Sequence, residues 1–347
     1  MDVNDFVRKI PKVELHNHII GAMRLETALD LAKKNGVPTP PGDPQNLYEY
    51  DNLIDFLTAH VFVSNTVQHR EDFARVAYEC LEDAYRTGNV RYSELFINPT
   101  NHMDEGISYQ VLIDGFIDGL HRAETDFGVK ARLIPSINRQ ESVASAMNML
   151  DMMIEHRRDE VIGIGIDHDE LPYPPENFAD VYIAAGKAGF RRTAHTSHDA
   201  PATWITTCLD LLGCERIDHG YKVIQDAEVL KRVRDEQVPF TCGMTTAQEF
   251  WKLPESDEPG APLVNPIKVM VEEGVNVTLG SDDPTMFHTD QGNEYIKFVN
   301  DFGFTAEQAI EVSLAALEGS WLSDSEKKTL RGEFDTELAT LRAQYGV

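Results

Sequence analysis

Val13-Glu14-Leu15-His16-Asn17-His18 is the first of eight short runs with the composition of buried strands, and stretches with helical periodicity separate these runs along the chain. The other seven runs are Tyr92–Asn98, Ala131–Ile137, Val161–Asp167, Arg191–His195, Arg216–His219, Pro239–Cys242 and Asn276–Ser281. Strands that alternate with helices pair in parallel and are joined by right-handed crossovers. Eight such units close most simply into a barrel, so we predict an α/β fold of the TIM-type (β/α)8 class.

The residues between the first two predicted strands, 19–91, are too many for a single crossover helix. We therefore predict extra helices in this insertion, lying over the mouth of the barrel. A second irregular stretch, Pro254 to Pro266, follows the seventh strand and is predicted to be a lid. Residues 323–347 have the pattern of a charged C-terminal helix packed outside the barrel. None of these segments is typical of a domain linker, so we expect one domain spanning residues 1–347.

The chain has 58 Asp and Glu residues against 31 Lys and Arg, which gives a formal net charge of −27. This charge would repel nucleic acid and anionic membranes, so we expect neither as a partner, although a solvated surface explains it equally simply. The sequence has no run of about 18 apolar residues and no apolar leader. Its four cysteines lack C-x-x-C spacing and lie in apolar patterns. We expect a cytoplasmic protein with a small-molecule partner, and the oligomeric state stays open.

Ionisable side chains stand at the C-terminal ends of four predicted strands, where barrel enzymes place their active sites. The first strand ends in His16-Asn17-His18, whose two imidazoles lie on one side of the strand and can share a metal ion. The fifth and sixth strands end in His195 and His219, and Asp282-Asp283 follows the eighth. Three imidazoles and one carboxylate suit zinc with an open position for a water molecule, which would ionise near neutral pH.

Each of these groups also has a purely structural explanation. Two histidines in H-x-H spacing often bind no metal, Asp282-Asp283 could cap the turn before Pro284, and His219 could be a hydrogen-bonded histidine of the barrel interior. The set as a whole favours a metal-dependent hydrolase, because four separate strand ends supply residues of the ligand type.

Three motifs, taken in order, carry a resemblance to a known family. They are Pro11-Lys12-Val13-Glu14-Leu15-His16-Asn17-His18 with Gly21, Glu215-Arg216-Ile217-Asp218-His219-Gly220, and Ser281-Asp282-Asp283-Pro284. Over nearly its whole length the chain resembles the adenosine/adenine deaminases of the amidohydrolase superfamily. The stretch Gly165-Ile166-Asp167-His168-Asp169-Glu170, with Pro174-Pro175-Glu176-Asn177-Phe178, is most similar to the bacterial adenine deaminase branch.

The resemblance implies one zinc ion per chain, held by His16, His18, His195 and Asp282. It also implies that His219 orients the attacking hydroxide and takes its proton, and that Asp283 exchanges a hydrogen bond with the imidazole edge of a purine. The implied reaction is attack of zinc hydroxide on the amino-bearing ring carbon of a 6-aminopurine base or nucleoside, with loss of ammonia. The residues expected to bind the substrate are Ile20, Gly21, His168, Asp169 and Asp283.

One catalytic position departs from the family pattern. Attack on the ring carbon pushes charge onto ring N1, and in the family a Glu three residues after the fifth-strand histidine delivers a proton there, whereas this chain has His198. In one interpretation His198 is the acid, since an imidazolium can donate a proton near neutral pH, or Asp199 reaches in instead. In a second, the zinc centre hydrolyses a different amino-heterocycle or an amide. In a third, the protein is a non-catalytic relative that binds metal and ligand.

Two further departures bear on the substrate. Ile20 stands where adenosine-specific members have an acidic residue that holds the ribose, so a ribose 5′-hydroxyl would lose its hydrogen-bond partner and plain adenosine is disfavoured. A packing role for Ile20 explains the residue equally well. His168 stands where the adenine branch has small residues, and it either alters the wall of the base site or is a surface histidine beside Asp167 and Asp169.

Overall fold

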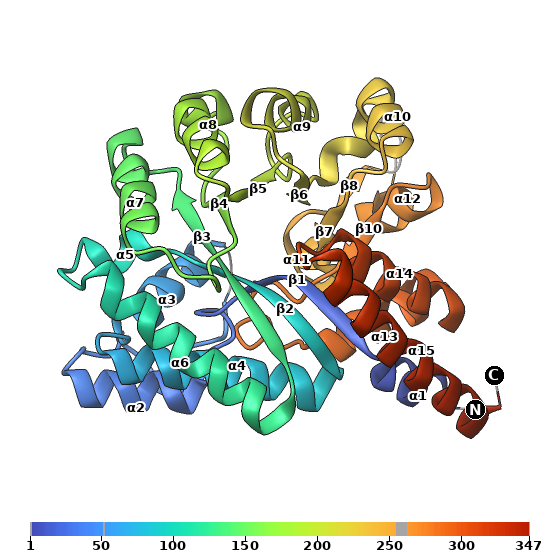
Figure 1. Cartoon of the computed structure of the whole chain (residues 1–347), viewed down its shortest axis with the longest axis horizontal. Helices are drawn as coiled ribbons and strands as arrows, with labels where there is room; N and C mark the ends of the chain where they lie inside the picture. Colours follow the sequence, from blue (N-terminus) through green and yellow to red (C-terminus); the bar gives the residue numbers. More distant parts are fainter. Residues whose placement is uncertain (1, 51–52, 255–261, 347) are drawn as a thin grey trace.

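The computed structural model describes residues 2–50, 53–254 and 262–346. Within them, eight parallel strands form one sheet in the order β1-β2-β3-β4-β5-β6-β7-β10, which curls into a barrel surrounded by helices (Figure 1). The strands are β1 (Lys12–His18), β2 (Val90–Ile97), β3 (Lys130–Asn138), β4 (Gly163–Asp167), β5 (Arg191–Thr196), β6 (Arg216–His219), β7 (Phe240–Cys242) and β10 (Val277–Leu279). Each begins and ends within two residues of its predicted bounds, and the predicted TIM-type barrel is confirmed.

The region between β1 and β2 contains more than one helix, as predicted. It holds α2 (Leu25–Asn35), α3 (Leu53–Asn65) and α4 (Arg70–Gly88), of which α4 packs beside α6 as the crossover helix. The remaining helices of the described chain are α1 (Val3–Lys9), α5 (Pro99–Met103), α6 (Tyr109–Phe127), α7 (Val143–Glu155), α8 (Ala179–Lys187), α9 (Thr203–Thr207), α10 (Ala227–Asp235), α11 (Met244–Phe250), α12 (Pro266–Glu272), α13 (Gln291–Phe302), α14 (Ala306–Gly319) and α15 (Asp324–Tyr345).

Local sequence signals explain where these helices begin and end. The helix α2 stops at Gly36, which takes the left-handed backbone conformation with a φ of 69°. The last helix, α15, begins with a capping box in which Ser323 and Glu326 bond to each other's backbone N–H groups. The predicted C-terminal helix is therefore present, and it lies beside α1 and α14, where Phe6 contacts Tyr345 (Figure 1).

The stretch after β7 differs from the predicted lid loop. It contains a short antiparallel pair, β8 (Leu253–Pro254) and β9 (Leu263–Val264), and the residues between them lie outside the described part of the chain. None of the described helices combines the length and apolarity needed to cross a bilayer. The four cysteines are buried free thiols.

The barrel closes at the seam between β1 and the residues after β10. The backbone N–H of His18 donates to the carbonyl of Asp282 (2.7 Å), and the N–H of Asp282 donates to the carbonyl of His16 (3.1 Å). A left-handed φ of 62° at Asp282 lets the chain make both bonds while it leaves the strand. The closing hydrogen bonds thus bring three predicted metal ligands together.

The opposite end of the barrel is closed by a buried ion pair. Arg216 Nη1 lies 2.6 Å from Glu94 Oε2, and both side chains are fully buried. The ring of Trp321, between α14 and α15, lies under the Arg216 guanidinium at 4.1 Å, and its backbone N–H donates to Glu94 Oε1. These contacts tie β2 and β6 to the chain between the last two helices.

We expect Arg216→Met to lower the free energy of unfolding by about 3–5 kcal/mol, because the substitution leaves the buried Glu94 carboxylate without its cationic partner. The double variant Glu94→Gln/Arg216→Met removes that orphaned charge and should recover most of the loss. Urea unfolding followed by circular dichroism measures both values. A loss below about 1 kcal/mol for the single variant would show that the pair contributes little to stability.

Candidate metal centre and active site

A cavity of about 360 Å³ opens at the C-terminal ends of the barrel strands. The strands and the loops after them contribute His18, Asn98, Gln140, Asp167, His168, Asp169, His195, His198, Asp199, His219, Asp282, Asp283 and Phe287. The helix α3 and the segment from α11 onward add Phe56, Leu57, His60, Thr246, Phe250 and Trp251. Most of the predicted site residues therefore line one space.

The predicted metal ligands converge at the floor of this cavity. Asp282 Oδ1 lies 3.3 Å from His16 Nε2 and 3.5 Å from His18 Nε2. The Nε2 atoms of His18 and His195 face each other at 3.1 Å. All four side chains are buried, and potential ligand atoms of His16, His18 and Asp282 lie within 4.8 Å of one another.

Hydrogen bonds behind the cluster fix which ring nitrogen of His16 faces it. The hydroxyl of Thr241 donates to Asp218 Oδ1 (2.7 Å), so its oxygen must accept the bond from His16 Nδ1–H (2.8 Å). In the neutral ring the other nitrogen, Nε2, then carries a lone pair that points at the Asp282 carboxylate and has no hydrogen-bond partner. A buried lone pair beside a carboxylate is costly unless a cation lies between them, so this donor set fits a metal ion.

The electrostatics of the cluster favour bound positive charge. Burial lowers the pKa of His18 to about 3, and the nearby His195 adds to the effect, so His18 is neutral and can act as a ligand. Burial would raise the pKa of Asp282, but His16 holds it well below its usual range. Asp282 in turn raises the pKa of His16 against the effect of burial. This pair attracts either a proton or a metal cation.

His219 lies next to the same cluster. Its ring centroid is 4.7 Å from that of His16 and 5.0 Å from that of His195. The hydroxyl of Tyr221 donates to the carbonyl of Gly243 (3.2 Å), so it accepts from His219 Nδ1–H (3.1 Å). Burial keeps the pKa of His219 well below its usual range. His219 is therefore a neutral imidazole whose Nε2 is free to accept a proton.

His198 lies beside His219, with 5.4 Å between the two ring centroids. Its Nδ1 is 3.1 Å from Asp199 Oδ2 and 3.6 Å from Glu170 Oε2. The ring of Trp251 packs against it at 4.7 Å. The residue that replaces the family Glu thus reaches the cavity, and two carboxylates face its far nitrogen.

Asp283 lines the cavity, and Gly21 supports it from behind. A Cβ atom at position 21 would lie 1.9 Å from Asp283 Oδ1, so only glycine fits there. Burial, with Asp282 adding, raises the pKa of Asp283 well above its usual range. Ile20, by contrast, belongs to the hydrophobic core and is absent from the described lining of the cavity. The packing explanation for Ile20 fits this position.

We expect Gly21→Ala to displace the Asp283 carboxylate and to reduce catalytic efficiency by about 10²-fold, since misplacement by about 1 Å costs that much. Gly332→Ala is the matched control, because no atom lies within 4 Å of a Cβ at this position of α15. The control should keep full activity and gain slight stability. Steady-state kinetics and thermal melts check both variants, and equal activity of the two would contradict the supporting role of Gly21.

His168 and Asp169 lie at the rim of the cavity. His168 Nδ1 lies 2.6 Å from Asp167 Oδ1, and Asn98 donates to both oxygens of Asp167 at 2.9 Å. Burial would raise the pKa of Asp167, but His168 holds it well below its usual range. Asp169 is exposed. His168 therefore pairs with Asp167, as expected of a surface histidine, and it also lines the cavity, as expected of a residue in the wall of the base site.

The backbone at four of the strand ends is left-handed. The φ angles are 71° at His168, 55° at Ser197, 64° at His219 and 62° at Asp282. Non-glycine residues in this region cost of order 1 kcal/mol each and cluster at functional sites. The turns aim the side chains of the strand ends into the cavity.

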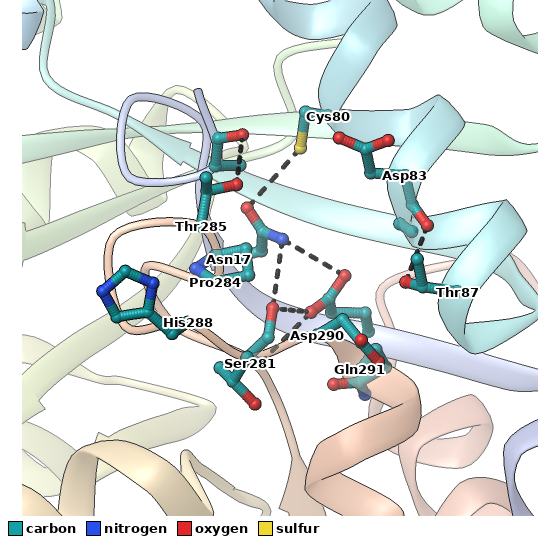
Figure 2. A pocket seen from close by; sticks show the side chains of 14 residues that line it. Asn17, Cys80, Asp83, Thr87, Ser281, Pro284, Thr285, His288, Asp290 and Gln291 are labelled. Atoms are coloured by element: carbon teal, nitrogen blue, oxygen red, sulfur yellow. Dashed lines mark hydrogen bonds between the residues drawn. The ribbon is translucent and has the colours of Figure 1, made fainter. Parts of the chain in front are cut away.

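A second cavity, of about 280 Å³, lies behind the seam between β1 and β10 (Figure 2). Asn17 and Ser281 face it from the barrel wall, and Cys80, Asp83 and Thr87 face it from α4. The buried carboxylate of Glu14 accepts hydrogen bonds from the backbone and hydroxyl of Ser281 and from Asn17. These bonds hold the residues next to the candidate metal ligands from outside the barrel.

The chain matches known proteins along most of its length. The family model for adenosine deaminase matches residues 11–337. Adenine deaminase of Schizosaccharomyces pombe is 32% identical, with 95% of this chain and 91% of that protein covered. The crystal structure of an Arthrobacter aurescens adenine deaminase is 31% identical with a TM-score of 0.86, covering 94% of this chain and 98% of that one. A Burkholderia ambifaria amidohydrolase crystallised with bound zinc is 32% identical with a TM-score of 0.87, covering 99% and 96%.

These matches confirm the resemblance carried by the sequence motifs at the strand ends. The match spans every barrel strand and all four candidate ligands. The chain belongs to the adenosine deaminase family.

Proposed function

We propose that this protein is a zinc-dependent hydrolase that removes the amino group of a 6-aminopurine base or nucleoside as ammonia. The observation that carries the proposal is the cluster at the cavity floor, where an unpartnered His16 Nε2 faces Asp282 and two further imidazole nitrogens meet at 3.1 Å. Relatives that share 31–32% identity with the chain are adenine deaminases, which supports this substrate class.

The residues that would hold the zinc ion are His16, His18, His195 and Asp282. A zinc ion bound there would lower the pKa of a coordinated water to about 7 and supply a nucleophile at neutral pH. The chain orients the ligands through Thr241 and through Asp218, whose Oδ2 lies 3.4 Å from His195 Nδ1. Such outer partners typically raise metal affinity by about 10–100-fold.

The remaining groups in the cavity would handle protons and position the purine. His219 presents an unprotonated Nε2 beside the cluster and would take the proton of the attacking water. Asp283 would exchange a hydrogen bond with the imidazole edge of the ring. His198 would protonate ring N1, where negative charge develops during attack. All three residues line the cavity, where His219 and His198 would transfer protons and Asp283 would position the ring.

The lining of the cavity favours an uncharged substrate. The described lining contains five aspartates, Asp167, Asp169, Asp199, Asp282 and Asp283, and neither Lys nor Arg. Phe56, Phe250, Trp251 and Phe287 supply aromatic faces on which a purine can stack. A phosphate group would meet like charge without a cationic partner, which costs several kcal/mol. A base or nucleoside therefore fits better than a nucleotide.

The test is to incubate zinc-loaded protein with adenine, adenosine or AMP and to follow ammonia release and the ultraviolet shift of the purine. We expect turnover of adenine or adenosine, with AMP slower by at least about 10²-fold in kcat/KM. Tight binding of adenine without ammonia would indicate a non-catalytic relative. Ammonia from another amino-heterocycle alone, or a preference for AMP, would contradict the proposed substrate class.

A further inference from the structure

We propose that Asp199 is a positioning residue which, with His198, forms a carboxylate–imidazole pair that supplies the ring-nitrogen proton in place of the single carboxylic acid of the family. The inference rests on the proposed function, because it concerns how the same site delivers that proton. Nothing in the family pattern requires a carboxylate–imidazole pair at this position. The pair is built by the contacts of residues 196–200 with three other segments of the chain.

Asp199 and Glu170 are the two candidate acceptors for the hydrogen bond of His198 Nδ1. Two carboxylates face this nitrogen, Glu170 Oε2 at 3.6 Å and Asp199 Oδ2 at 3.1 Å. Glu170 is buried and already accepts four hydrogen bonds, from the Thr196 hydroxyl and from the backbone N–H groups of Ser197, Asp199 and Ala200. Asp199 is the nearer carboxylate and has the free acceptor capacity, so Nδ1–H donates to Asp199.

Hydrogen bonds from neighbouring residues hold Asp199 in place. Trp251 Nε1 donates to Asp199 Oδ2 at 3.4 Å, and the ammonium group of Lys222 donates to the Asp199 carbonyl. The backbone N–H of Lys222 also donates to the carbonyl of Ser197 (2.8 Å), which anchors the same turn. The indole of Trp251 packs on the His198 ring at 4.7 Å and so limits its rotation. Both members of the pair are thus fixed by neighbours.

The orientation of the His198 ring decides which of its nitrogens faces the cavity. With Nδ1 bonded to Asp199, the Nε2 atom of His198 is the nitrogen available to the cavity, on the side of His219. The hydrogen bond to His198 lowers the pKa of Asp199, so this carboxylate is ionised and stabilises an imidazolium. The other charged or titratable groups around the ring are Glu170, His219 and Lys222.

The proton transfers balance over the whole reaction. His198 Nε2–H passes its proton to ring N1, where that proton stays in the product, and His198 becomes neutral while Nδ1–H still bonds to Asp199. The water proton taken by His219 leaves with the amino group as ammonia when the carbon–nitrogen bond breaks. The hydroxyl proton passes to solvent as the ring carbonyl forms, and it balances the proton that stays at N1. The Asp199 side chain is 45% exposed, so solvent can reprotonate the pair.

The test uses Asp199→Asn in zinc-loaded protein, with Asp151→Asn, an exposed carboxylate of α7, as the matched control. With adenine as substrate, we expect kcat of Asp199→Asn to fall by about 10–100-fold while KM changes little. The carboxylate stabilises the imidazolium that donates the proton, so its removal should slow the proton-donation step. Asp199→Glu should restore part of kcat.

A second readout does not need turnover. Long-range ¹H–¹⁵N spectra of ¹⁵N-histidine-labelled protein report which ring nitrogen carries hydrogen, and the His198 signals are those missing from His198→Gln. We expect Nδ1–H in the wild type and in Asp151→Asn, and a mixture of tautomers in Asp199→Asn. Unchanged signals in Asp199→Asn would overturn the proposal whether or not adenine is a substrate. A loss of kcat that Asp199→Glu does not rescue would also overturn it.

Discussion

Asp282→Asn is expected to abolish stoichiometric zinc binding and to reduce deamination by a factor on the order of 10⁴. Asp282 is the one carboxylate of the cluster, and it faces both His16 and His18 from the far side of the barrel seam. Asparagine tolerates the left-handed φ of 62° at this position, so the variant removes the charge while keeping the backbone. The loss therefore reports on the ligand rather than on the fold.

Metal analysis after dialysis, with activity measured on the same sample, checks this prediction. Asp151→Asn is again the control, and it should keep one zinc ion per chain and full activity. Circular dichroism should show the same helix content in both variants. An Asp282→Asn protein that retains one tightly bound zinc ion and near-normal turnover would remove Asp282 from the ligand set.

His198→Gln is expected to lower kcat by about 10²–10³-fold with zinc content unchanged, because general acid catalysis typically contributes that much. Glutamine keeps a polar side chain of similar reach but has no acidic proton to deliver. His198 lies in the cavity wall against Trp251 and Asp199 and is outside the group of four candidate ligands. Loss of the proton donor should therefore leave metal binding intact.

The control for His198→Gln is His121→Gln, an exposed histidine of α6 that pairs with Glu160. His198→Glu is a second comparison, since it restores the acid of the family and should retain deamination well above that of His198→Gln. Stopped-flow or steady-state kinetics on metal-replete samples separates the three. Full activity of His198→Gln would show that this residue is not the proton donor.

The barrel and the cluster at its floor could be predicted because parallel topology brings all the strand ends to one rim. His16 and His18 on β1, His195 on β5 and Asp282 after β10 are far apart in sequence, yet each is a ligand-type residue at a strand end. The number of strands was enough to predict that the barrel closes, but not the two backbone hydrogen bonds of Asp282 at the seam.

Other parts of the site could not be predicted, because their roles depend on contacts that no local pattern encodes. Thr241 lies inside β7 and resembles any other strand threonine, but its hydroxyl links Asp218 to His16. Trp251 follows α11 and reaches His198 only through the folded turn. For Ile20 the sequence left a substrate role and a packing role open, and only the fold shows that its side chain packs in the core. The wall of the cavity was therefore harder to predict than its floor.

In the proposed reaction, one metal ion in the cluster of His16, His18, His195 and Asp282 activates water for attack on an aminopurine. The most direct measurement is to titrate metal-free protein with zinc while following ammonia release from adenine. We predict that the rate rises linearly and saturates at one zinc ion per chain, and that Asp282→Asn gives no such rise. A rate that is independent of zinc would contradict the role of the metal ion. The absence of ammonia from adenine and adenosine at any zinc content would contradict the proposed deamination.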